Sequence, residues 1–166
     1  MILIGVNIAA WLMLHLGIAW AGMQVPFQWF SPRQRLFRAR GWEAAGRAYE
    51  RYFGIRRWKD RLPDGAALFA GGFRKAELRS VSREYLERFV HETCRGEAVH
   101  WAVLGSAVLF FAWNPWPIGL VMVGYALVVN MPCILVQRYN RLRLAQLSLR
   151  VRAAAGGRRA GPEVPK

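Results

Sequence analysis

The sequence has few cysteines, few acidic side chains and long stretches without any charge. Its 166 residues include 2 Cys, too few for a miniprotein held together by disulfides. Asp and Glu number 10 against 24 Lys and Arg, which gives a formal net charge of +14. Hydrophobic residues make up 54% of the chain, which excludes an intrinsically disordered protein. A soluble basic domain remains, as does a small membrane protein that keeps its charges apart from its apolar residues.

The short motifs of several common enzyme classes are also absent. The chain has no Gly-rich phosphate loop, no paired-Cys metal site and no nucleophile elbow. None of His15, His91 and His100 is followed by an Asp four or five residues later, so the His-x4-Asp motif of many acyltransferases is missing. The sequence therefore predicts neither a metal site nor a bound cofactor.

Charged and apolar residues are segregated along the chain. Residues 1–32 contain no Lys, Arg, Asp or Glu, and residues 1–23 are almost continuously apolar. About 20 apolar residues suffice to cross a membrane, so residues 1–23 predict a first transmembrane helix. A signal peptide is the alternative for this segment. It is disfavoured, because a positively charged n-region is missing and no exported domain follows.

A second apolar region predicts a transmembrane helical hairpin over residues 97–136. Two apolar runs, residues 98–113 and 118–136, flank the turn Asn114-Pro115-Trp116-Pro117. This double-proline turn ends one helix and is short enough to return the chain directly. We therefore expect an all-α integral membrane protein with about three transmembrane helices plus cytoplasmic amphipathic helices.

The excess positive charge lies outside the apolar runs. Residues 33–96 form a basic, aromatic-rich region in which residues 33–54 predict an amphipathic helical stretch, and Ser82 predicts a helix N-cap. Residues 137–152 predict a basic juxtamembrane helix, and residues 153–166 a disordered basic tail. With three spans, both basic regions lie on the same side of the membrane. The positive-inside rule predicts that this side is the cytoplasmic one. The expected location is a bacterial inner membrane, with the N-terminus outside and the C-terminus in the cytoplasm.

Glu97 and His100 are the best candidates for chemistry. They are three residues apart on a predicted helix, so they share a face where the second span enters the membrane. A carboxylate at that depth normally faces the protein interior or a water-filled cavity. Glu97 could hold the His100 imidazole in one tautomer, so that His100 takes a proton from a hydroxyl. The alternative, favoured by spacing alone, is a pair of interfacial residues beside Trp101 that only marks the membrane boundary.

The third span ends in a run of polar residues. Asn130 precedes Gln137 by seven residues, so it lies roughly 10 Å deeper, near the depth expected for His100. Asn130 could pair with a neighbouring helix or bind a substrate hydroxyl. Arg138, Arg141 and Arg143 could reach lipid phosphates, or they could bind the phosphates of a soluble donor.

Three blocks of residues carry a resemblance to a known family. These are Arg57-Trp58-Lys59 with Asp64-Gly65; Glu92-Thr93 with Arg95, Glu97, His100 and Trp101; and Asn130-x-Pro132 with Val136-Gln137-Arg138-Tyr139-Asn140-Arg141-x-Arg143-Leu144-x-Gln146-Leu147. In their order and spacing, the chain resembles the glycosyl-4,4'-diaponeurosporenoate acyltransferase family of staphyloxanthin-type carotenoid biosynthesis. It departs from the family's pattern at Leu142, where a Pro is expected.

The resemblance implies a membrane acyltransferase. It would transfer a fatty acyl group from a cytosolic thioester, on coenzyme A or an acyl carrier protein, to a sugar hydroxyl of a glycosylated carotenoid or related glycolipid. His100 and Glu97 would be catalytic, and Arg138, Arg141 and Lys59 would hold the donor phosphates. The residues expected to bind substrate are Asn130, Gln137, Arg138, Tyr139, Asn140, Arg141, Trp58, Lys59 and Asp64. The expected partners are membrane lipid, the lipid acceptor and the acyl carrier protein, and nucleic acid is not expected. The sequence leaves open whether the protein forms a homo-oligomer.

Two other functions remain open from the residues alone. Another small membrane-embedded transferase, such as a methyltransferase, would also place polar residues in the cytoplasmic half of a few spans. A non-catalytic membrane scaffold would use the basic face to bind anionic lipid or partners. The scaffold has no need of buried Glu97, His100 and Asn130, so substitutions at these positions separate it from an enzyme.

Overall fold

The structure is a computed structural model that describes residues 2–62, 73 and 78–159, with the backbone alone for residues 154–159. The described residues form helices and no strand, which confirms the all-α prediction. The longer helices are α1 (Ile2–Gln24), α3 (Arg83–Ser106) and α4 (Trp116–Arg159), and α2 (Arg47–Phe53) is shorter. The 3-10 turns are η1 (Phe27–Trp29), η2 (Gly41–Gly46), η3 (Ile55–Arg57), η4 (Lys59–Arg61) and η6 (Ala107–Ala112).

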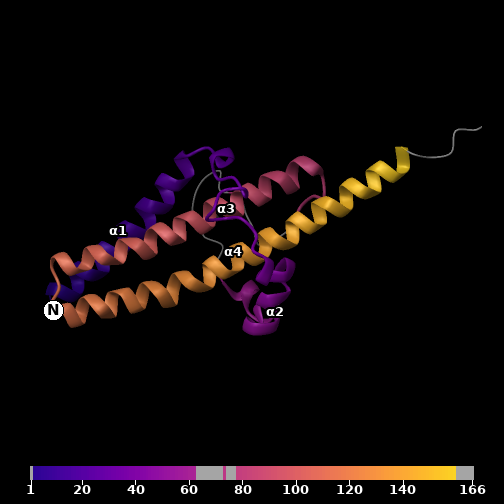
Figure 1. The fold of residues 1–166 in the computed structure, drawn as a ribbon. Coiled ribbons are helices and arrows are strands. Elements are labelled where there is room, and N and C mark those ends of the chain that lie inside the picture. The colour runs from indigo at the N-terminus through magenta and orange to yellow at the C-terminus, as the bar shows by residue number, and fades with distance from the viewer. Residues whose placement is uncertain (1, 63–72, 74–77, 160–166) are drawn as a thin grey trace, which may run out of the picture.

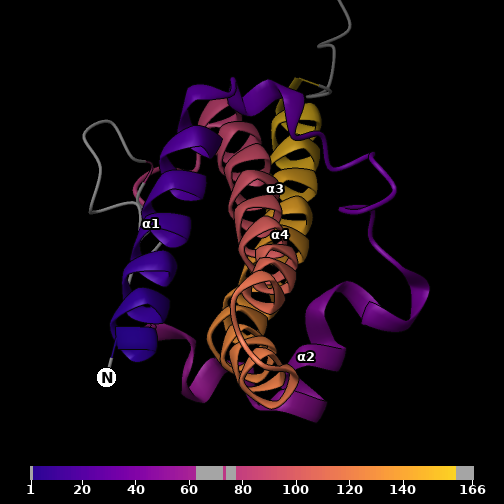
Figure 2. The same cartoon turned by 90° about the vertical axis from the view of Figure 1, so that its left-hand side faces the viewer.

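Helices α3 and α4 run antiparallel as a hairpin, with α1 and α2 on opposite sides of it (Figures 1 and 2). Helix α3 begins at the predicted N-cap, where the Ser82 hydroxyl accepts a hydrogen bond from the Tyr85 amide. The chain reverses between η6 and α4. Asn114 stabilises this reversal, because its side-chain amide donates to the Phe110 carbonyl at 2.9 Å.

Helix α1 packs against the end of the hairpin that contains the reversal. The Trp11 ring stacks on Phe110 with the ring centres 4.4 Å apart, and both side chains are buried. The side-chain amides of Asn7 and Asn114 exchange two hydrogen bonds of 2.9 and 3.0 Å. Paired amides satisfy each other where water is excluded. They therefore fix the position of α1 along the hairpin.

Among the described residues, two helices are long and apolar enough to cross a membrane, namely α1 and residues Trp116–Ala153 of α4. Large apolar side chains on both are exposed, among them Ile2, Met13, Val121 and Val128. The second of the three expected spans is not a separate long apolar helix. Its residues are divided between the end of α3, whose first half is charged, and η6. The two apolar helices indicate association with a membrane.

Helix α4 extends well beyond the length of a span. Its 44 residues measure about 66 Å at 1.5 Å per residue, against about 30 Å for the hydrocarbon core of a bilayer. Helix is also present at residues 153–159, where the sequence predicted a disordered tail; residues 160–166 lie outside the described residues. The extension is stabilised by α3, because Leu144 packs on Leu86 and Phe89 and Arg152 pairs with Glu87.

The chain between α1 and α3 is less helical than its sequence pattern indicates. The predicted helical stretch over residues 33–54 is wrong for residues 33–40, which form turns and extended backbone. Two backbone carbonyls in this part, those of Leu36 and Arg38, accept hydrogen bonds from Arg138 of α4 instead. A long-range partner thus replaces local helical bonding. Asp64, which was expected to bind substrate, lies outside the described residues.

Candidate functional site

His100 and Asn130 face each other across the interface of α3 and α4. His100 Nδ1 lies 3.0 Å from Asn130 Oδ1, and Asn130 is fully buried. The Asn130 Nδ2 group donates to the Ala126 carbonyl one turn earlier in α4, at 3.0 Å. That second hydrogen bond directs the amide oxygen, and not the amide nitrogen, toward the imidazole.

This arrangement selects one tautomer of His100. An amide oxygen only accepts hydrogen bonds, so the proton of the neutral imidazole is on Nδ1. The ring lone pair is then on Nε2, the nitrogen that can act as a base. Asn130 therefore sets the orientation and the tautomer of His100. The sequence placed both residues at the same depth but did not predict this pairing.

The Glu97 carboxylate is engaged by arginines of α4. Arg138 Nη1 donates to Glu97 Oε1 at 2.9 Å, and Arg141 Nη2 donates to Oε2 at 2.6 Å. The indole of Trp101 donates to Oε1 at 3.3 Å. The sequence assigned Glu97 to orient His100, but the hydrogen bond at His100 Nδ1 goes to Asn130. Glu97 instead joins α3 to two guanidinium groups of α4.

A second buried carboxylate completes this group of charges, which we call the ion-pair layer: Glu43, Glu97, Arg138 and Arg141. Arg138 Nε donates to Glu43 Oε1 at 2.9 Å, so one guanidinium connects two carboxylates. Their exposed fractions are 0% for both acids, 9% for Arg138 and 3% for Arg141. Two negative and two positive charges cancel, which is the condition for burying them at acceptable cost.

The ion-pair layer attaches the chain after α1 to the hairpin. Glu43 belongs to η2, and its carboxylate also accepts from the Tyr49 hydroxyl and the Arg40 amide, both at 2.6 Å. Burial raises the pKa of Glu43, but the hydrogen bonds from Arg138, Tyr49 and Arg40 outweigh it, so the pKa is lowered. Burial, with the Glu43 carboxylate close by, raises the pKa of Tyr49 to about 12. Glu43 therefore stays ionised and Tyr49 stays neutral at physiological pH.

Several predicted substrate-binding residues have structural contacts in the fold. Arg138 and Arg141, expected to hold donor phosphates, are buried in the ion-pair layer. The Tyr139 hydroxyl donates to Glu50 of α2 at 2.7 Å. The Trp58 indole donates to the Phe53 carbonyl at 2.9 Å. These contacts hold the segment around α2 against α4.

Gln137 is different, because its Oε1 atom is buried without a hydrogen-bond partner among the described residues. Its side chain lies against Gly96 of α3, where an added Cβ would come within 3.0 Å of the amide. Gly96 is one turn before His100. A small residue at position 96 thus lets the Gln137 amide lie between the helices near the imidazole. Arg141 Nη1, one turn further along α4, is also buried without a partner among the described residues.

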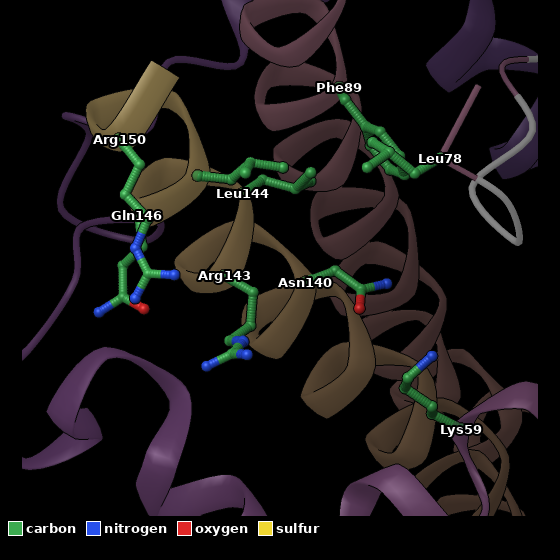
Figure 3. A pocket seen from close by; sticks show the side chains of 9 residues that line it. Lys59, Leu78, Phe89, Asn140, Arg143, Leu144, Gln146 and Arg150 are labelled. Carbon is green, nitrogen blue, oxygen red and sulfur yellow. The ribbon is translucent and has the colours of Figure 1, made fainter. Parts of the chain in front are cut away.

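Lys59 and Asn140 line a pocket of about 330 Å³ beside the extension of α4 (Figure 3). Arg143 and Arg150 line it as well, and Lys59 enters from the chain segment that follows α2. Sequence reasoning named Arg143, together with Arg138 and Arg141, as a candidate for binding phosphate, and it missed Arg150. The spacing of seven residues between Arg143 and Arg150 puts them on one side of a helix, but only the fold shows that Lys59 is close to them.

Comparison with known proteins identifies the family. A family model described as glycosyl-4,4'-diaponeurosporenoate acyltransferase matches residues 28–150. The chain belongs to the glycosyl-4,4'-diaponeurosporenoate acyltransferase family. Proteins of that name from Staphylococcus aureus strains bovine RF122 / ET3-1 and USA300 are 32% identical to it over 148 residues, 89% of this chain and 88% of theirs. No solved structure is significantly similar to the chain.

Membership in this acyltransferase family confirms the resemblance that the three motif blocks indicated. The chain is therefore an enzyme of the acyltransferase class, and a purely structural scaffold is not its function. The matched residues include His100, Asn130, all four members of the ion-pair layer and the three cations of the pocket. The whole candidate site thus lies within the part of the chain that defines the family.

Proposed function

We propose that this protein transfers a fatty acyl group from a cytosolic thioester to a sugar hydroxyl of a membrane-bound glycolipid. The observation that carries the proposal is the hydrogen bond from His100 Nδ1 to Asn130 Oδ1, which leaves a basic lone pair on Nε2. A neutral imidazole held in one tautomer is suited to take a proton from a hydroxyl. Asn130 is fully buried and bonded at both ends of its amide, so it keeps the ring in that state.

The reaction follows from this geometry. His100 Nε2 takes the proton of the sugar hydroxyl while the oxygen attacks the carbonyl carbon of the thioester. The new carbon–oxygen bond forms, the carbon–sulfur bond breaks, and the leaving thiolate recovers the proton from the imidazolium. The Gln137 amide, which lies against Gly96 one helical turn before His100, would accept a hydrogen bond from another sugar hydroxyl, which would satisfy its buried Oε1 atom.

The acceptor we propose is a glycosylated carotenoid or a related glycolipid. The relatives are named for an acceptor of this kind. An acceptor dissolved in the bilayer would meet the site through the exposed apolar faces of α1 and α4, where Leu12, Leu120 and Val121 contact the surroundings. Such a substrate brings its sugar to the membrane surface and keeps its apolar part in the hydrocarbon.

We also propose three membrane spans, with the N-terminus outside and the C-terminus in the cytoplasm of a bacterial cell. The apolar end of α3 and η6 lies antiparallel to the first half of α4, so the two must occupy the same layer of the membrane. Val108 and Leu109 of η6 are exposed, as expected of a surface that faces lipid. Both basic regions then lie on the cytoplasmic side, where a soluble donor is available.

Reconstitution of the purified protein in nanodiscs tests the proposed reaction. The nanodiscs contain a glycosylated carotenoid, and the protein receives either an acyl thioester with a labelled acyl chain or labelled S-adenosylmethionine. We expect an ester-linked product, seen by mass spectrometry, from the thioester alone. Methylated product would support the alternative transferase. No product from the thioester with any glycolipid acceptor would contradict the proposal.

A further inference from the structure

The pocket beside the extension of α4 combines three cations with two amide side chains. Lys59, Arg143 and Arg150 supply the positive charge, and Asn140 and Gln146 supply hydrogen-bonding groups (Figure 3). The volume of about 330 Å³ is at the lower end of the range for small-molecule sites. No Asp or Glu is among the described residues that line it. Such a lining favours an anionic ligand.

The arginines of the pocket differ from those of the ion-pair layer. The guanidinium groups of Arg138 and Arg141 are bound to Glu97 inside the fold. Arg143 and Arg150 have no ion pair among the described residues, and Lys59 pairs only with its chain neighbour Asp60, whose side chain is 71% exposed. An arginine without an internal partner keeps its fork of donors for a phosphate. The phosphate-binding role that the family resemblance implied for Arg138 and Arg141 therefore suits Arg143 and Arg150 better.

The position of the pocket along α4 is also informative. Arg143 follows Asn130 by 13 residues, about 20 Å along the helix axis, on the side away from the hairpin reversal. A thioester donor carries its acyl group at the end of a pantetheine arm, well separated from the phosphate at the other end of that arm. If Arg143 binds the phosphate, the pantetheine arm can therefore extend from there along α4 toward His100. The apolar wall formed by Phe89, Leu144 and Leu147 suits the aliphatic part of such an arm.

We propose that this pocket binds the phosphate of the donor's phosphopantetheine arm, through Arg143, Arg150 and Lys59. The inference rests on the proposed function, because it assigns the donor of the same reaction. Coenzyme A and an acyl carrier protein both carry this phosphate, so the shared chemistry is that of the arm. Acyl-pantetheine has the arm and the thioester but lacks the phosphate, and it serves as the matched donor.

The test uses the full-length protein in nanodiscs of neutral phosphatidylcholine, with the double variant Arg143→Gln/Arg150→Gln. Binding is measured with radiolabelled coenzyme A alone, and turnover is measured with acyl-coenzyme A, acyl carrier protein and acyl-pantetheine. The control is Arg152→Gln, which removes one positive charge from the same helix but outside the pocket. Thermal unfolding of each variant checks that it is folded.

We expect the double variant to raise the Kd of coenzyme A and the KM of acyl-coenzyme A at least tenfold, the effect of losing charge-assisted hydrogen bonds to a phosphate. The KM for acyl-pantetheine and the kcat should change less than twofold, and Arg152→Gln should change both KM values less than twofold. A parallel rise with the acyl carrier protein extends the site to that donor.

Three results would overturn the proposal. The first is an unchanged Kd and KM for coenzyme A donors in the folded double variant. The second is an equal rise in KM for acyl-pantetheine, which has no phosphate. The third is a loss of bound phosphatidylglycerol in mixed nanodiscs without any effect on the donor, which would assign the cations to lipid. Failure of the proposed function looks different, because the wild-type protein would then transfer no acyl group from any of the donors.

Discussion

The His100–Asn130 pair and the ion-pair layer both lie between α3 and α4, one helical turn apart on α3 and more than two turns apart on α4, but they differ in kind. In the ion-pair layer, each carboxylate is bound to a guanidinium and the four charges cancel. In the His100–Asn130 pair, a neutral amide oxygen accepts a hydrogen bond from Nδ1 of the imidazole, so that Nε2 is the basic nitrogen of the ring in its neutral form. The comparison shows that the most buried charges hold the fold together, whereas the group that we propose to be reactive lies outside this set of ion pairs.

Substitution of His100 tests the reactive half of this comparison and should have the largest effect. His100→Gln keeps a polar side chain but removes the base, so turnover should fall by about 10²–10⁴-fold, the usual contribution of general-base catalysis. Thermal unfolding in detergent should change little. The control is His91→Gln on the same helix, whose imidazole contacts the Phe30 carbonyl far from Asn130. Near-normal turnover in His100→Gln would remove His100 from the mechanism.

Substitution of Glu97 tests the structural half. Glu97→Gln leaves Arg138 and Arg141 with one carboxylate between them, and breaking a buried pair in this way costs about 3–5 kcal/mol of the free energy of unfolding. The midpoint of thermal unfolding should therefore drop clearly. Glu97→Gln/Arg141→Gln restores the balance of charge and should recover part of the loss. An unchanged midpoint with abolished turnover would instead place Glu97 in the chemistry.

Substitution of Asn130 measures how strongly the amide controls the imidazole. Asn130→Ala removes the hydrogen bond to His100, worth about 1 kcal/mol, so kcat should fall about fivefold while KM stays the same. Steady-state kinetics separate the two constants, and Val129→Ala in the preceding position is the control. A raised KM with an unchanged kcat would show that Asn130 binds substrate and does not position His100.

Acid should weaken the ion-pair layer through Glu43, the smallest of the four effects. The pKa of Glu43 is lowered in the folded protein from an ordinary value of 4.5. Because the pKa of Glu43 is lower in the folded than in the unfolded protein, ionised Glu43 stabilises the fold at every pH above the unfolded pKa. This contribution is lost as the pH falls below about 4.5 and then through the folded pKa. The thermal midpoint of the wild-type protein should thus drop more between pH 5 and about pH 3 than that of Glu43→Gln. Equal slopes for the two proteins would contradict this assignment.

Part of the candidate site could be predicted from the sequence. His100 and Asn130 were expected at matching depths, because an antiparallel hairpin and the rise per residue fix the depth of each. The partner of each side chain could not be predicted in this way. Glu97 shares a helix face with His100, but its partners Arg138 and Arg141 are more than 40 residues away, and local spacing carries no information on such contacts.

The sequence by itself determined the helical class, the apolar segments, the hairpin reversal at Asn114 and the family. These depend on composition, helix-breaking residues and motif spacing, which are all local properties. Only the tertiary structure decided which basic side chains are buried and which remain available. Arg138 and Arg143 are only five residues apart on α4, but Glu43, from η2 and 95 residues before Arg138, neutralises the first, while the second lines the pocket. The reason is that a buried charge requires a partner of opposite sign, and the fold brings that partner to one side of α4 alone.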